Sequence, residues 1–148
     1  MIRVGIAEEQ FMVCFELQFI TGVHMNKSII GIDHPAVAAE DPTKLANWYE
    51  EVLGYEKFHH TEKNVWIMRA MDGTLLEIMP KDETNRPNRT CWTPGWSHLS
   101  LRVNDLEMAT AELRKHGVQL EDAVPAIGGG MLRSFYDPEG NMLQIVQR

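Results

Sequence analysis

The strongest constraint on the fold is a strand that occurs twice, once in the middle of the chain and once at its end. Segment 72–79 reads Asp-Gly-Thr-Leu-Leu-Glu-Ile-Met, and segment 139–146 reads Glu-Gly-Asn-Met-Leu-Gln-Ile-Val. Each copy begins with a glycine-containing turn and continues as an apolar run around one polar residue, Glu77 or Gln144. Because strand side chains alternate between faces, these two residues point away from their apolar neighbours. The chain therefore reads as two copies of one unit.

Each copy is predicted to be a strand, a helix and three further strands. Aspartate suits the N-cap of a helix and glycine suits the position just after its end, so Asp41 with Gly54 and Asp105 with Gly117 bound the two helices. The strands of the first copy are expected at 28–37, 55–60, 64–71 and 74–79. Those of the second are expected at 95–103, 131–136 and 142–146, with a further strand that opens at 118–120. The predicted fold class is α+β, with two βαβββ modules forming a cupped mixed sheet.

The expected domain organisation is one domain over residues 27–148, with an N-terminal extension over 1–26. Module one spans 27–80, a proline-rich linker spans 81–94, and module two spans 95–148. Residues 1–24 are either a leader foreign to the functional domain or an extra strand that pairs with a sheet edge or a second subunit.

Composition restricts the partners and the compartment. The net charge of −7 disfavours nucleic acid and anionic membrane surfaces. No apolar run approaches the ~20 residues that a membrane-spanning helix needs. The two cysteines, Cys14 and Cys91, match no metal or redox spacing. We therefore expect a cytoplasmic protein with free thiols.

Four polar residues occupy matched positions in the two copies. His34 and His98 lie on the first predicted strands, and Glu77 and Gln144 lie on the last ones. All four can point to the helix-free, concave face of the sheets. Imidazole suits Zn, Ni, Fe or Mn, and oxygen ligands suit the harder ions, so the set predicts a divalent metal site with open positions. The alternative is a cavity that binds a ligand without metal.

Residues 27–148 resemble the vicinal oxygen chelate superfamily, which includes glyoxalases, bleomycin-resistance proteins and extradiol dioxygenases. Three segments carry the resemblance: 34–35, 47–55 and 135–141. The resemblance implies paired modules, a homodimer, and a divalent metal ion held by His34, Glu77, His98 and Gln144. It also implies a small substrate or ligand.

The chain departs from the family pattern at Gln144, where many catalytic members have glutamate. An amide oxygen can ligate a metal but cannot act as a base near neutral pH. Glu77 is therefore the candidate catalytic base. The resemblance implies a metal-dependent lyase, isomerase or dioxygenase, and the alternative is a non-catalytic protein that sequesters a ligand in the manner of bleomycin-resistance proteins.

Several residues are candidates for the walls of a substrate pocket. Apolar walls with a few polar groups are typical of small-ligand sites. Arg133 suits a carboxylate or phosphonate on the ligand, although an exposed ion pair explains it equally well. Taken one at a time, each tryptophan and methionine side chain fits plain core better than a pocket wall. The candidate substrate-binding residues are Trp66, Met68, Trp96, Arg133 and Phe135.

Overall fold

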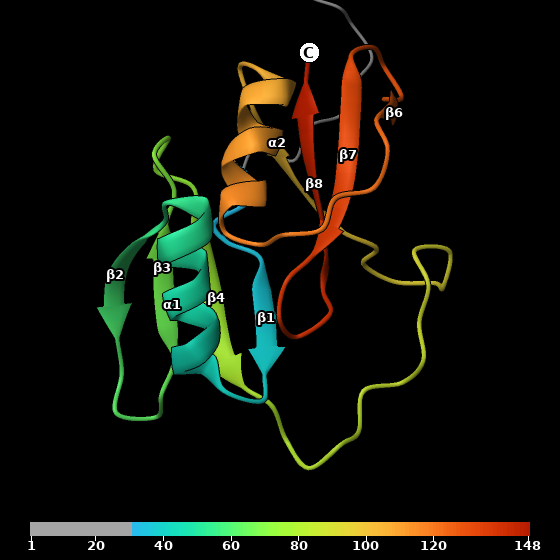
Figure 1. The fold of residues 1–148 in the computed structure, drawn as a ribbon. Helices are drawn as coiled ribbons and strands as arrows, with labels where there is room; N and C mark the ends of the chain where they lie inside the picture. Colours follow the sequence, from blue (N-terminus) through green and yellow to red (C-terminus); the bar gives the residue numbers. More distant parts are fainter. Residues whose placement is uncertain (1–30) are drawn as a thin grey trace, which may run out of the picture. The chain divides into compact units, whose positions relative to one another are not determined.

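The computed structural model describes residues 31–148, which contain two four-stranded mixed sheets with one helix each (Figure 1). The first module consists of β1 (Ala36–Ala39), α1 (Pro42–Leu53), β2 (Glu56–His60), β3 (Trp66–Arg69) and β4 (Leu75–Pro80). The second consists of β5 (Leu99–Arg102), α2 (Leu106–Lys115), β6 (Val124–Pro125), β7 (Met131–Tyr136) and β8 (Met142–Gln147). The predicted α+β class with two βαβββ modules is confirmed. The expectations for residues 1–26 and for Cys14 lie outside the described residues.

The two sheets have the same topology. Their strand orders are β1-β4-β3-β2 and β5-β8-β7-β6. In each sheet the first and last strands of the module pair in parallel, and the other neighbours pair antiparallel. This pairing puts Ala36 opposite Glu77 and Ser100 opposite Gln144. The polar residue of each closing strand therefore lies beside the start of its module.

Both helices begin at the predicted caps. The side chain of Asp41 accepts a hydrogen bond from the Lys44 backbone N–H at 2.9 Å, and that of Asp105 accepts one from the Met108 N–H at 2.8 Å. Each bond satisfies a donor that the first turn leaves without a partner. The first helix ends at Gly54, whose φ of 71° is left-handed and favours glycine. In the described residues, no helix has the length and apolar character to cross a membrane.

Three predicted strands differ most from the strands in the structure. The first begins at Ala36 rather than before His34, since Pro35 has no N–H to donate to a ladder. The fifth begins at Leu99 rather than Gly95, because the carbonyls of Pro94 and Trp96 accept hydrogen bonds from Arg89 instead. Residues 118–120 form no strand, because the Val118 N–H donates to Leu113 at the end of α2, and the next strand is β6.

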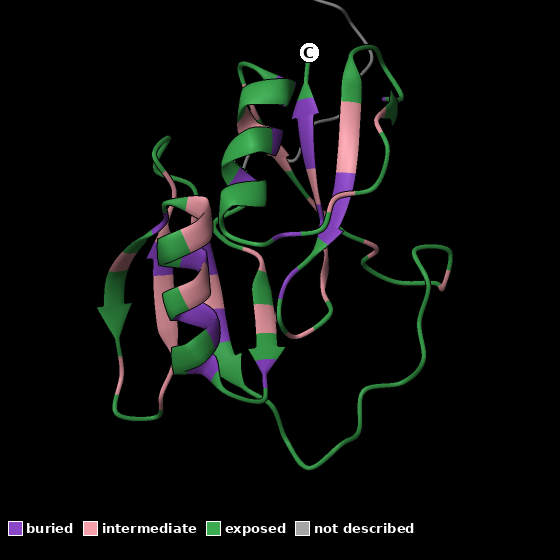
Figure 2. Cartoon of the chain, viewed as in Figure 1, coloured by how far each residue is buried: buried purple, intermediate pink, exposed green. Residues whose placement is uncertain are grey.

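The core lies between each sheet and its helix, as the burial pattern in Figure 2 shows. In both closing strands the residues beside the polar one are buried, while Glu77 and Gln144 are half-buried. The helix-free face therefore carries the polar residues. The buried strand residues are Leu76 and Ile78 in β4, and Leu143 and Ile145 in β8.

The turn between β7 and β8 connects the second module to the first. The Tyr49 hydroxyl of α1 donates to Asp137 Oδ2 at 3.4 Å, and Glu139 Oε1 accepts from the backbone N–H groups of Glu40 and Asp41 at 3.0 and 3.3 Å. A carboxylate is favourable at the N-terminal end of α1 because of the helix dipole. Burial raises the pKa of both Tyr49 and Asp137. This turn is therefore part of the contact between the modules as well as a reversal of the chain.

Replacing Gly130 with alanine is expected to destabilise the fold by about 2–4 kcal/mol. Its φ is 84°, and an added Cβ would lie 2.0 Å from the Gln147 carbonyl oxygen, which is backbone and can move only with β8. Gly129→Ala is the matched control, since its φ is 100° but a Cβ there meets no atom within 4 Å. Equal urea midpoints for the two variants would contradict the close approach at Gly130.

Candidate functional site

The first half of the site is the pair His34 and Glu77. The Glu77 N–H donates to the Pro35 carbonyl at 3.0 Å, which extends the β1–β4 ladder and draws the preceding His34 alongside Glu77. His34 Nε2 lies 3.5 Å from Glu77 Oε2, and the two side chains are 33% and 26% exposed. Two ligands bound at about 2.1 Å to one ion lie about 3.0–3.5 Å apart in octahedral or tetrahedral geometry. The pair therefore has the spacing of two ligands that share a divalent cation.

Asp33 contacts the other nitrogen of the same imidazole ring. Asp33 Oδ1 lies 2.6 Å from His34 Nδ1, so the ring lies between two carboxylates. With its hydrogen on Nδ1, a neutral His34 presents the Nε2 lone pair to Glu77. Facing lone pairs on a nitrogen and an oxygen repel each other unless a proton or a cation lies between them.

The second half of the site is a row of neutral polar side chains. Ser100 on β5 donates to Gln144 Oε1 at 2.9 Å, and Gln144 Nε2 lies 3.4 Å from Ser134 Oγ on β7. The register places all three on adjacent strands at the same level, on the face opposite the core. The amide oxygen keeps a second lone pair for a ligand or an ion.

His98 lies one residue before β5, and its ring is exposed. Its Nδ1 is 3.0 Å from Ser97 Oγ. The four predicted metal ligands therefore do not form one cluster within this chain. Among residues 31–148, no three His, Cys, Asp or Glu side chains are grouped to hold a metal ion. The structure brings together only the pair from the first module.

The register of the sheets places most predicted substrate-binding residues on the helix-covered face. Trp66 is opposite Ile78 and Met68 is opposite Leu76, so both lie on the core side of the first sheet. Met68 is fully buried, and the Trp66 indole N–H reaches Thr43 of α1 and Asn64. Both side chains therefore lie on the opposite face of the sheet from Glu77, and the core position of Met68 fits the alternative interpretation of these residues as plain core.

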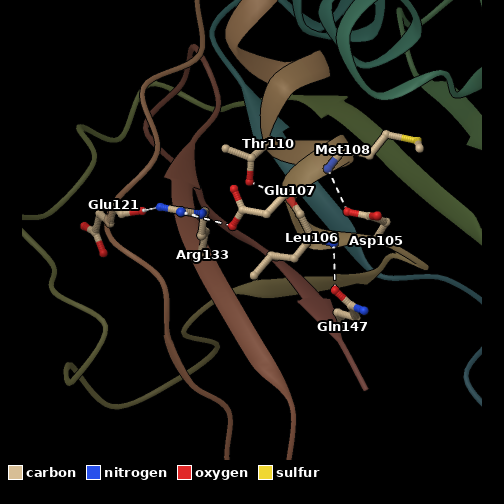
Figure 3. Close-up of polar contacts among 8 residues, drawn as sticks. All are labelled: Asp105, Leu106, Glu107, Met108, Thr110, Glu121, Arg133 and Gln147. Atoms are coloured by element: carbon tan, nitrogen blue, oxygen red, sulfur yellow. Dashed lines mark hydrogen bonds and ion pairs between the residues drawn. The ribbon is translucent and has the colours of Figure 1, made fainter.

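The same holds for β7 in the second sheet. Arg133 is opposite Ile145 and Phe135 is opposite Leu143, and Phe135 is fully buried in the core. Figure 3 shows the Arg133 guanidinium between the Glu121 carbonyl at 3.1 Å and the Glu107 carboxylate of α2 at 3.3 Å. Arg133 therefore joins the second sheet to its helix, and the ion pair of the alternative interpretation is present.

Other residues share the face of Glu77 and Gln144. Ile67 is opposite Glu77, and Ser134 is opposite Gln144. Sequence reasoning missed Ser100 and Ser134 as partners of Gln144. No pattern in β7 identifies which of its residues lie on the helix-free face, because polar and apolar residues do not alternate along the strand. Trp96 lies in the segment before β5 and is largely exposed.

Comparison with known proteins identifies the family of this chain. The family model of the Glyoxalase/Bleomycin resistance protein/Dioxygenase superfamily matches residues 31–145. The chain belongs to this superfamily. No curated protein sequence matches it significantly.

Solved structures with the same fold include proteins of different activity. TnmS3, an antibiotic binding protein from Streptomyces sp. CB03234, is 22% identical with a TM-score of 0.65, covering 84% of this chain and 98% of its own. Lactoylglutathione lyase from Agrobacterium tumefaciens is 17% identical with a TM-score of 0.64, covering 82% and 96%. A mutant of the fosfomycin resistance protein FosX from Listeria monocytogenes, complexed with Mn(II) and 1S,2S-dihydroxypropylphosphonic acid, is 16% identical with a TM-score of 0.62, covering 80% and 90%. At these sequence identities, this chain shares the fold of the three proteins, and a shared fold does not establish a shared activity.

Proposed function

We propose that this superfamily member binds a divalent metal ion, Zn, Ni, Fe or Mn, and acts on a small substrate with two neighbouring oxygen atoms, as a metal-dependent lyase or isomerase. The observation that supports this most is the His34 Nε2–Glu77 Oε2 distance of 3.5 Å on the helix-free side of the first sheet. One nitrogen and one oxygen ligand from adjacent segments form half of a mononuclear site that leaves positions open for substrate.

His98 and Gln144 are proposed as the other two ligands, supplied by the second module of another copy in a homodimer. The two modules have the same strand order, and each carries one imidazole next to its first strand and one oxygen donor on its last. Within the described part of one chain these donors do not form a group of three. A second copy that faces its second sheet toward the first sheet of its partner completes the set.

The proposed chemistry assigns one role to each donor. A bound divalent ion supplies Lewis-acid stabilisation of negative charge on substrate oxygens. Glu77 is the only carboxylate among the four donors, so it is the proposed general base. Gln144 holds its amide between Ser100 and Ser134 and contributes an oxygen ligand without accepting a proton.

Elemental analysis tests the proposal directly. Protein purified without chelator is expected to carry about one divalent ion per chain, and dialysis against a chelator is expected to lower its melting temperature. The melting temperature should recover when one of the four metals is restored. Protein that contains no metal, and gains no thermal stability from any of the four, would falsify the proposal.

A second candidate function is sequestration of a ligand without catalysis. The row Ser100–Gln144–Ser134 favours it, because three neutral hydrogen-bonding groups suit ligand recognition as well as they suit metal binding. The negative net charge of −7 suits a basic ligand. If the protein sequesters a ligand without catalysis, it should bind that ligand tightly, and a chelator should not change the affinity.

The substitution Gln144→Glu distinguishes the two functions. It keeps the shape of the side chain and adds a second carboxylate, so the metal-dependent enzyme should gain proton-transfer activity of about 10-fold or more. Exchange of the α-proton of small α-hydroxy ketones with deuterated water, followed by NMR, measures this gain. The isosteric charge control is Glu77→Gln, which should lose exchange. A sequestering protein shows no exchange in any of the three forms.

A further inference from the structure

We infer that Asp33 is a positioning residue, which holds the His34 ring in one tautomer and directs Nε2 toward Glu77. The inference rests on the proposed function only in one respect, that the ligand for which the ring is positioned is a metal ion. The geometry of the ring itself stands on contacts within the first module. Asp33 Oδ1 is 2.6 Å from Nδ1, and Glu77 Oε2 is 3.5 Å from Nε2.

The Asp33 contact determines where the hydrogen of a neutral His34 lies. An ionised carboxylate only accepts hydrogen bonds, so the ring atom next to it must be the donor. The hydrogen therefore belongs on Nδ1, and Nε2 keeps its lone pair. Metal-ligating histidines commonly donate their second ring N–H to a carboxylate or carbonyl in this way, which orients the ring and raises the basicity of the ligating nitrogen.

The internal repeat supplies a comparison within the same chain. His98 has Ser97 at the equivalent preceding position, 3.0 Å from its Nδ1. A serine hydroxyl both donates and accepts, so it allows either tautomer of His98. Of these two histidines, only His34 has an acceptor-only group, the Asp33 carboxylate, at Nδ1, and His34 is also the one whose Nε2 lies near a carboxylate, that of Glu77. The two modules thus differ at this position in a way that matters for the lone pair of Nε2.

Asp33 contributes little to the stability of the fold. Its side chain is 86% exposed, and it lies before β1 and outside the core. Exposed hydrogen-bonded ion pairs contribute little to folding. Removing the carboxylate should therefore change the ring without unfolding the module.

The experiment begins with metal-free protein, in which ¹⁵N NMR of the imidazole nitrogens reports the tautomer well above the ordinary imidazole pKa. Wild-type His34 is expected to carry its hydrogen on Nδ1. Asp33→Ala should convert a large fraction to the Nε2–H form, and Asp33→Ser should give a mixture like that of His98. The control Asp122→Ala removes an exposed aspartate elsewhere and should change nothing. An unchanged His34 tautomer in Asp33→Ala overturns the inference.

Titration with Zn²⁺ then tests the purpose of the positioning. Asp33→Ala is expected to weaken Zn²⁺ binding by roughly 10-fold or more, at an unchanged melting temperature of the metal-free protein. If the tautomer changes but the Zn²⁺ affinity does not, the proposed role of Asp33 in metal binding is overturned. Wild-type protein that does not bind Zn²⁺ or the other three metals counts against the proposed function instead, and the tautomer comparison still decides what Asp33 does to the ring.

Discussion

The double substitution His34→Ala, His98→Ala is expected to remove stoichiometric metal from the protein and to weaken Zn²⁺ binding by at least roughly 100-fold. It deletes both nitrogen ligands of the proposed site and leaves only Glu77 and Gln144. Two oxygen ligands do not hold a borderline ion such as Zn²⁺ well. Isothermal titration calorimetry on chelator-treated protein measures the loss, and elemental analysis of freshly purified protein checks it.

The fold of this variant should be intact, because both histidines lie outside the strands and outside the core. The matched control is His59→Ala, His116→Ala, which removes two other exposed imidazoles and should leave metal binding unchanged. Equal metal content in the two double variants would place the metal elsewhere or show that binding is non-specific.

Replacing Asp137 with alanine is expected to cost about 3 kcal/mol of folding free energy, which lowers the melting temperature by about 10 °C. The Asp137 residue is 4% exposed. Its Oδ1 accepts from the backbone N–H groups of Glu139 and Asn141, and its Oδ2 accepts from the Asn141 side chain and from Tyr49. Alanine leaves these donors without an acceptor in a half-buried turn. Differential scanning calorimetry measures the effect.

Two further variants separate the hydrogen bonds from the charge. Tyr49→Phe removes one long hydrogen bond and should cost about 1 kcal/mol. Asp137→Asn retains an acceptor for the backbone N–H groups and should lie between the wild type and Asp137→Ala. A melting temperature of Asp137→Ala within a degree of the wild type would show that the turn does not depend on this carboxyl group.

The pH dependence of the same carboxyl group has a definite sign. Burial raises the pKa of Asp137 above its ordinary value of 3.8, so the folded state binds this proton more tightly than the unfolded state. The stabilisation that comes from binding this proton is therefore fully present below pH 3.8 and is lost as the pH rises through the raised pKa, while the hydrogen bonds to the carboxyl group remain. Relative to Asp137→Asn, the wild type should become less stable across this window, which urea unfolding at several pH values can follow.

Local rules predicted much of this fold, since they depend only on neighbouring residues. Asp41, Gly54 and Asp105 were recognisable as helix caps because a cap satisfies backbone groups within one turn of itself. The predicted bounds of the strands were less accurate. At Pro35, for example, the pairing with the neighbouring strand β4 decides where β1 begins. The position of Arg133 was not predictable, because a strand without alternation can present either face to its helix until its register with β8 is set.

The repeated closing strand, by itself, determined the two-module architecture. It also showed that Glu77 and Gln144 occupy equivalent positions in the two modules, because alternation with a period of two and turn residues can be recognised from neighbouring residues alone. Only the tertiary structure decided what these two residues contact. Parallel pairing with β1 brings Glu77 to His34, whereas parallel pairing with β5 brings Gln144 to Ser100. Such contacts join residues far apart in sequence, and they follow from strand register and packing, which no local pattern specifies.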